Sequence, residues 1–168
     1  ELAAAHAGPC YLRLGRPAAP ILYNPGEPFA IGRCKVLRRG VNDRALIVAA
    51  GVTVAEALAA HEQLRQEDIS VGVIDLFSIR PLDVEELSRT AAECSGIVIT
   101  VEDHYAHGGL GDAVTAALPP GLCRCHKIAI REIAHSGKPD ELLDKYGISA
   151  RHIVDQVKSA INPERARS

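Results

Sequence analysis

The chain contains 168 residues, of which 47% are hydrophobic and 24% are charged, and its formal net charge is -2. This composition excludes an intrinsically disordered chain and is typical of one globular domain with a sizeable core. The small net charge argues against nucleic acid or an anionic membrane as a partner. No apolar run approaches the roughly 20 residues that a membrane-spanning helix requires.

The amino terminus, Glu1 to His6, lacks the basic start and apolar centre of a secretory signal, and the sequence contains no methionine. We therefore expect a piece of a longer polypeptide, located in the cytoplasm. The five cysteines are Cys10, Cys34, Cys94, Cys123 and Cys125. Their odd number and irregular spacing predict reduced thiols, and the pair at 123 and 125 has no second pair that would complete a structural zinc site.

Residues 9–32 differ in composition from the rest, because they contain five prolines. A short strand at residues 10–12 followed by an extended linker is the structure that this pattern predicts. The composition changes near Gly32. We therefore place a domain boundary there, with residues 1–32 before it and one compact domain over residues 33–168.

The compact region alternates apolar runs with helical patterns. Continuous apolar runs predict strands that are buried on both faces. The predicted strands are residues 35–38, 45–50, 69–77, 97–101 and 127–131. Strands that alternate with helices predict an α/β fold with a mostly parallel sheet and helices on both faces.

Capping residues mark where the predicted helices begin. Thr53-x-x-Glu56 is a capping box, Asp83-x-x-Glu86 is a weaker one, and Pro139 fits a first helical position. Another helix covers about residues 109–118, and Ser149 caps the last one. The predicted inward-facing residues are Val54, Ala57, Leu58, His61 and Leu64, then Val84, Leu87 and Ala91, and finally Ile153, Val154, Val157 and Ile161.

The stretch 101–114, V-E-D-H-Y-A-H-G-G-L-G-D-A-V, concentrates carboxylates, histidines and glycines after a predicted strand. Four interpretations are open. The glycines at a helix start resemble a phosphate cradle, but the third glycine position is Val114. Glu102, His104 and His107 could bind a metal or exchange protons. The favoured interpretation is a loop that packs closely and bonds locally.

The linker places Arg13 and Arg16 on either side of Leu14 and Gly15. A guanidinium group matches phosphate with two parallel hydrogen bonds. A phosphorylated small substrate is therefore a reasonable partner, although an isolated linker arginine is more often only solvated.

Five phrases resemble the C-terminal part of a transketolase, in the order of that family. They are residues 8–17, 50–57, 75–83, 100–105 with 108–111, and 136–143. The resemblance implies a three-layer α/β/α domain with a five-stranded mixed sheet, one edge strand of which is antiparallel. It also implies that residues 1–32 are the end of a pyrimidine-binding domain and its linker, and that residues 33–168 are the transketolase C-terminal domain.

Transketolases transfer a two-carbon ketol unit from a ketose phosphate to an aldose phosphate, with thiamine diphosphate and a divalent metal, Mg²⁺ or Ca²⁺. The resemblance implies that both cofactors lie on preceding domains. The G-D-G motif, with which the family binds the metal and the diphosphate, is absent from this chain. We therefore expect no catalytic, cofactor-binding or metal-binding residue here. Arg16 matches the family arginine that binds the substrate phosphate, and Arg13 is a weaker candidate. Gly15 stands where relatives often have serine.

The resemblance further implies a homodimer that needs the missing N-terminal domains for activity, so that this part alone is inactive and supports the dimer. Two alternatives stay open. One is a standalone binding or regulatory module of the same fold. The other is the same domain of a related thiamine enzyme, either deoxyxylulose phosphate synthase or a 2-oxoacid dehydrogenase β subunit.

Overall fold

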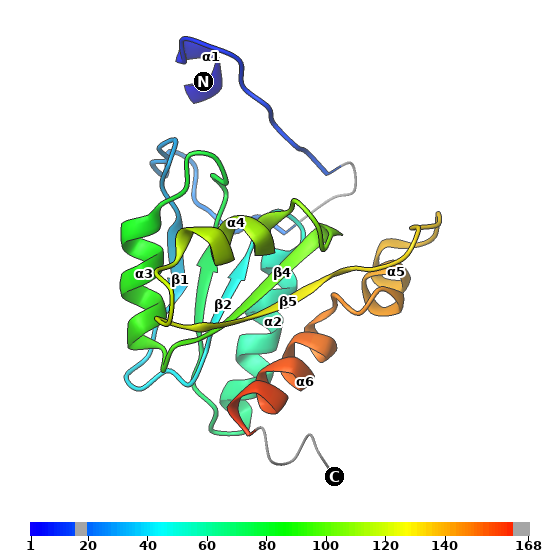
Figure 1. Cartoon of the computed structure of the whole chain (residues 1–168). Coiled ribbons are helices and arrows are strands. Elements are labelled where there is room, and N and C mark those ends of the chain that lie inside the picture. Colours follow the sequence, from blue (N-terminus) through cyan, green and yellow to red (C-terminus); the bar gives the residue numbers. More distant parts are fainter. Residues whose placement is uncertain (16–19, 163–168) are drawn as a thin grey trace.

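A five-stranded mixed sheet forms the centre of the molecule in a computed structural model, which describes residues 1–15 and 20–162 (Figure 1). The strands are β1 (Lys35–Arg38), β2 (Leu46–Ala49), β3 (Gly72–Asp75), β4 (Ile97–Tyr105) and β5 (Arg124–Ile130). Their order is β1-β3-β2-β4-β5. β1 runs antiparallel to β3, and the other neighbouring pairs are parallel.

Helices cover both faces of the sheet, which confirms the predicted three-layer α/β/α class (Figure 1). The helices are α1 (Leu2–Ala5), α2 (Thr53–Gln66), α3 (Val84–Glu93), α4 (Leu110–Ala117), α5 (Pro139–Lys145) and α6 (Ala150–Ile161). α2 and α6 pack on one face, and α3 and α4 pack on the other. Among the described residues, no helix is long and apolar enough to cross a membrane.

The core lies in two layers, and alternate residues of β2 contribute to each. Ile47 and Ala49 belong to the cluster under α2 and α6, whereas Leu46 and Val48 belong to the cluster under α3 and α4. All four are fully buried. A strand with helices on both faces needs an apolar residue at every position, which explains the continuous run in the sequence.

The predicted capping box at the start of α2 is wrong. Thr53 is the first residue of the helix, and its hydroxyl donates to the carbonyl oxygens of Ala50 at 3.0 Å and Val101 at 2.9 Å. Glu56 Oε2 instead accepts the backbone N–H of Ala150 at 2.7 Å, which caps α6. Ser149 precedes α6 but makes no side-chain cap. Thr53 and Glu56 therefore connect different elements of the fold instead of forming one local cap.

Three further expectations differ from the structure. β4 continues to Tyr105, so residues 102–105 extend the strand and are not loop. Val84 was predicted to face inward, but 42% of its surface is exposed. Residues 10–12 form no strand, and Tyr11 is 88% exposed. A strand needs a paired neighbour, and no strand of the described residues pairs with this segment.

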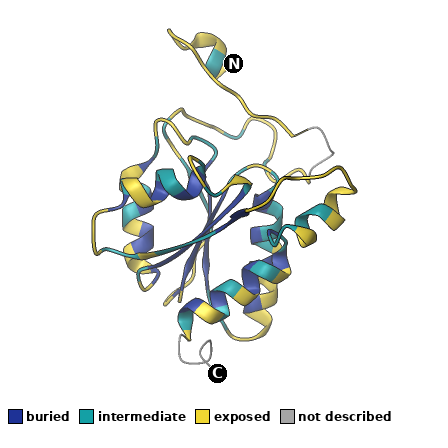
Figure 2. Cartoon of the chain, turned by 45° about the vertical axis from the view of Figure 1, so that its right-hand side comes forward, coloured by how far each residue is buried: buried dark blue, intermediate teal, exposed yellow. Residues whose placement is uncertain are grey.

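The amino-terminal segment, which comprises α1 and the residues that follow it to about Leu12, stands away from the sheet and its helices (Figure 1). Its surface is almost entirely exposed (Figure 2). Arg13 reaches the domain through an ion pair with Asp103, and aromatic packing begins at Tyr23. Tyr23 packs edge to face on Phe29 at 5.0 Å between ring centroids, and Phe29 packs on Phe77 at 4.9 Å. These rings fasten residues 23–29 to the chain that follows β3.

Candidate functional site

A cavity of about 510 Å³ lies at the carboxyl ends of the parallel strands. Gly51 and Val52 line it from the turn after β2, Asp103 from the end of β4, and Ile130 from the end of β5. After β2 the chain forms β3 on one side of β2, and it then crosses back to form β4 on the other side. Open α/β sheets bind ligands at such a reversal of strand order, so this cavity is the first candidate for a site.

The walls of this cavity carry more acidic than basic groups. Glu56, Asp103 and Asp140 line it, together with His135. Asp103 is paired with Arg13 at 3.4 Å, and both side chains are about half exposed. A phosphate would therefore meet carboxylates here, and it would need a lysine or arginine, which the described lining residues do not include.

Arg16, the predicted phosphate-binding residue, lies outside the described residues. Gly15 and Pro20, the nearest described residues on either side, both line the cavity. Phosphate binding by Arg16 stays a prediction. The weaker candidate, Arg13, already forms an ion pair with Asp103, and this pair would have to open before Arg13 could bind phosphate.

Glu102 is the buried polar centre of the stretch 101–114. Its carboxylate is 4% exposed and accepts the N–H of Leu110 at 2.6 Å and the N–H of Gly111 at 2.9 Å. These are orphan donors of the first turn of α4, where negative charge is favourable. A β-carbon at position 109 would collide with this carboxylate, which explains Gly109. Glu102 thus caps α4 from the preceding strand.

This geometry decides against the phosphate cradle in the same stretch. A helix N-terminus binds an anion through its free N–H groups. Here the carboxylate of Glu102 takes two of them. The N–H of Gly108 donates to Asp112 at 2.6 Å. A phosphate would have to displace the protein's own carboxylates.

The two histidines of this stretch, His104 and His107, are exposed. His104 Nδ1 bonds to the carbonyl oxygen of Tyr105 at 2.9 Å and lies 3.9 Å from the carboxylate of Glu102. Within residues 1–15 and 20–162, no group of three or more His, Cys, Asp or Glu side chains could hold a metal ion. The structure therefore favours the interpretation that residues 101–114 pack and bond locally.

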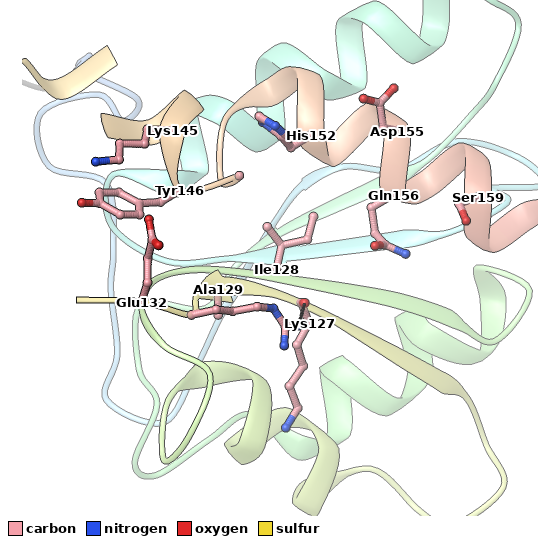
Figure 3. A pocket seen from close by; sticks show the side chains of 12 residues that line it. Lys127, Ile128, Ala129, Glu132, Lys145, Tyr146, His152, Asp155, Gln156 and Ser159 are labelled. Atoms are coloured by element: carbon pink, nitrogen blue, oxygen red, sulfur yellow. Dashed lines mark hydrogen bonds between the residues drawn. The ribbon is translucent and has the colours of Figure 1, made fainter. Parts of the chain in front are cut away.

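A second hollow, of about 740 Å³, lies between β5 and the helices α5 and α6 (Figure 3). Lys145, His152, Glu132 and Asp155 line it, so both signs of charge are present. Lys127 also lines it but forms an ion pair with Asp112 on α4. This hydrogen bond holds the pKa of Asp112 below its usual value. The mixed charges give this hollow no clear ligand chemistry.

The described residues do not fit thiamine diphosphate with its divalent metal. The diphosphate needs cations or free N–H groups, and the metal needs converging oxygen ligands. The cavity at the strand ends presents carboxylates, the first turn of α4 is already capped, and no metal-binding group is formed among the residues described. No step of cofactor chemistry can be assigned to these residues.

Sequence reasoning missed the contact between Tyr23 and Asp75. The hydroxyl of Tyr23 lies 2.5 Å from Oδ2 of Asp75, which is 5% exposed. Burial raises the pKa of Asp75, and burial followed by the bond to Asp75 raises the pKa of Tyr23. The sequence gives one indication of this contact, which is Asp75 at the end of an apolar run, because a buried carboxylate needs a partner.

Comparison with known proteins identifies the family. The sequence model described as "Transketolase, C-terminal domain" matches residues 32–153. Transketolase-like protein 1 of Macaca fascicularis is 49% identical over 160 residues, which cover 94% of this chain and 27% of that protein. Transketolase of Homo sapiens is 42% identical over 163 residues, which cover 96% of this chain and 26% of that protein.

A solved structure described as "Split gene transketolase, inactive beta4 tetramer" superposes with a TM-score of 0.88 and 37% identity. The match covers 95% of this chain and 52% of that chain. The present chain spans about a quarter of the length of the curated relatives that it matches. Sequence and fold agree over most of the chain, and it therefore belongs to the transketolase C-terminal domain family.

Proposed function

We propose that this chain is the C-terminal part of a transketolase and supports ketol transfer only together with domains that bind thiamine diphosphate and a divalent metal. The match over residues 32–153, in a chain that spans about a quarter of its relatives, supports this proposal most directly. The relatives that are 42–49% identical carry transketolase names, which favours this enzyme over other thiamine enzymes of the same fold.

Exposed apolar side chains before β1 support the proposal that this chain contacts a partner domain. Tyr11, Leu12, Leu14 and Ile21 are between 64% and 93% exposed, so four large apolar side chains face solvent before β1. An apolar surface of this kind marks a protein contact. In the proposal, these four side chains lie against the cofactor-binding domains, and two such assemblies form a dimer.

Reconstitution tests the proposal. The chain is assayed for ketol transfer from a ketose phosphate to an aldose phosphate, with thiamine diphosphate and Mg²⁺. It is assayed alone and after co-expression with the N-terminal domains of the same enzyme, which carry the G-D-G motif. We expect turnover only in the combined sample. Turnover by the chain alone, or none in a soluble combined complex, would contradict the proposal.

A matched pair of variants tests the contact surface. Leu14→Glu places a charge on the apolar segment and should abolish association in size-exclusion chromatography. Val41→Glu places the same charge on the turn between β1 and β2, where Val41 is 89% exposed, and should leave association unchanged. Equal behaviour of the two variants would show that the segment does not bind the partner.

The role of Arg16 is tested in the reconstituted enzyme. Arg16→Ala should raise KM for phosphorylated substrates far more than for unphosphorylated ones, since a charge-assisted hydrogen bond contributes about 1.5–3 kcal/mol. Arg124→Ala is the control, because Arg124 lies at the opposite, amino-terminal end of a parallel strand. Equal effects of Arg16→Ala on both substrate types would mean that Arg16 does not recognise phosphate.

A further inference from the structure

Two cysteines at the start of β5 have their sulfur atoms in contact. Cys123 Sγ and Cys125 Sγ are 3.7 Å apart. The two residues are separated by one position, and side chains at such positions of an extended chain point to the same face. Arg124 lies between them and is exposed. The pair therefore results from the strand itself.

Both thiols are accessible from one side and packed from the other. Cys123 and Cys125 are half-buried and pack against the core layer under α3 and α4. Cys125 lies beside Val98 of β4 in the parallel ladder, which fixes its backbone. The sulfur atoms are thus held near one another by the sheet but are not sealed inside it.

The surroundings disfavour the thiolate form of Cys123. Burial, followed by the hydrogen bond to Cys125 and its charge, raises the pKa of Cys123 to about 11. A protonated thiol is a poor nucleophile toward peroxide. One electropositive atom that bonds to both sulfurs would remove the repulsion between their negative charges.

The separation of the sulfurs fits one bridging atom. Two sulfurs bound to one centre at about 2.3 Å, with an angle of about 100–109° between the bonds, lie roughly 3.5–3.8 Å apart. The observed 3.7 Å therefore needs little movement of the strand. Four-coordinate zinc lacks the further ligands, because no three His, Cys, Asp or Glu side chains cluster in the described parts of the chain. Soft elements, which bind thiolates strongly, need only the two.

We propose that Cys123 and Cys125 form a dithiol site that binds one soft, thiophilic centre through both sulfurs. Trivalent arsenic in phenylarsine oxide serves as the probe. Two arsenic–sulfur bonds form, while the arsenic–oxygen bond and two S–H bonds break. The oxygen leaves as water with both protons, and no electrons are exchanged with another reagent.

Intact mass spectrometry of the reduced 168-residue chain tests the site. The chain is treated with phenylarsine oxide and then with excess 2-mercaptoethanol. We expect one arsenical to be retained, and dithiothreitol to remove it. Chelation by two thiols should exceed attachment to one by about 10²–10⁴-fold. Cys123→Ser and Cys125→Ser should therefore each lose the retained adduct.

Controls come from the other thiols. Cys10 is exposed and Cys34 is half-buried, and neither is paired with another thiol among the described residues. Cys10→Ser and Cys34→Ser should keep the adduct. Retention by Cys123→Ser or Cys125→Ser, or no retained adduct on the unaltered chain, would overturn the proposal.

A protection experiment removes any dependence on how the variants fold. The unaltered chain is alkylated with iodoacetamide before and after binding of phenylarsine oxide, and the labelled positions are mapped by peptide sequencing. Cys123 and Cys125 should both become protected, while Cys10 stays reactive. Protection of only one of the two, or of neither, would contradict a site that uses both sulfurs.

Discussion

Tyr23 donates a hydrogen bond of 2.5 Å from its hydroxyl to Oδ2 of Asp75, which joins the segment before β1 to the carboxyl end of β3. The other oxygen of Asp75 has no hydrogen-bond partner among the described residues. Lys35 lies over the rings of Tyr23 and Phe29 and pairs with Glu27. A buried carboxylate, two rings and an ion pair thus attach this segment to the edge of the sheet.

Removal of the Tyr23 hydroxyl should destabilise the domain. Tyr23→Phe keeps the ring packing but leaves the carboxyl of Asp75 without its donor. A buried polar group without a partner costs about 1–3 kcal/mol, and the free energy of unfolding in urea should fall by this amount. Tyr11→Phe, at a side chain that is 88% exposed, is the control and should have almost no effect. Equal values for the two variants would mean that the bond to Asp75 contributes nothing.

Asp75 should make stability depend on pH in the direction opposite to a paired surface carboxylate. Burial raises its pKa in the folded state, so the folded chain holds this proton more tightly than the unfolded chain. The contribution of Asp75 to stability is therefore complete below the ordinary aspartate pKa of about 3.9. It is lost as pH rises from there through the raised pKa.

Asp75→Asn tests this dependence, because the amide can still accept from Tyr23 but does not ionise. The free energy of unfolding is measured from pH 4 upward for both proteins. The unaltered chain should lose stability relative to Asp75→Asn as pH rises. A difference between the two that does not change with pH would show that Asp75 titrates normally in the folded state.

The cap that Glu102 forms on α4 should contribute measurably to stability. Glu102→Ala removes the acceptor of two N–H groups in the first turn, and loss of a helix cap costs about 0.5–2 kcal/mol. The melting temperature should fall in thermal unfolding followed by circular dichroism. His107→Ala, an exposed residue of the same stretch, should leave it nearly unchanged. An unaffected melting temperature for Glu102→Ala would refute this role.

Glu56, rather than Ser149, should cap α6. Glu56→Ala removes the acceptor of the Ala150 N–H and should lower the free energy of unfolding by about 0.5–2 kcal/mol. Glu56→Gln retains an amide oxygen and should recover part of the loss. Ser149→Ala removes only hydrogen bonds to Asp144 and His152 on the surface, so its effect should be smaller. The reverse order in urea unfolding would contradict the assignment.

The sequence alone determined the class of fold, because burial on both faces leaves a local pattern. The apolar runs at β2 and β4 predicted buried parallel strands, and their alternation with helices predicted the layers. The extent of the elements was less certain. β4 continues through Glu102 to Tyr105, because β5 pairs with it beyond the apolar run and polar residues at the strand end carry no hydrophobic signal.

Only the tertiary structure decided which residues act together. Thr53 and Glu56 fit a local capping box in sequence, yet their partners Val101 and Ala150 lie 48 and 94 residues away. Tyr23 and Asp75 are separated by 52 residues. Hydrophobic periodicity is a local property that a sequence displays directly. The partner of a polar group depends on which elements the fold brings into contact, and no local pattern encodes that.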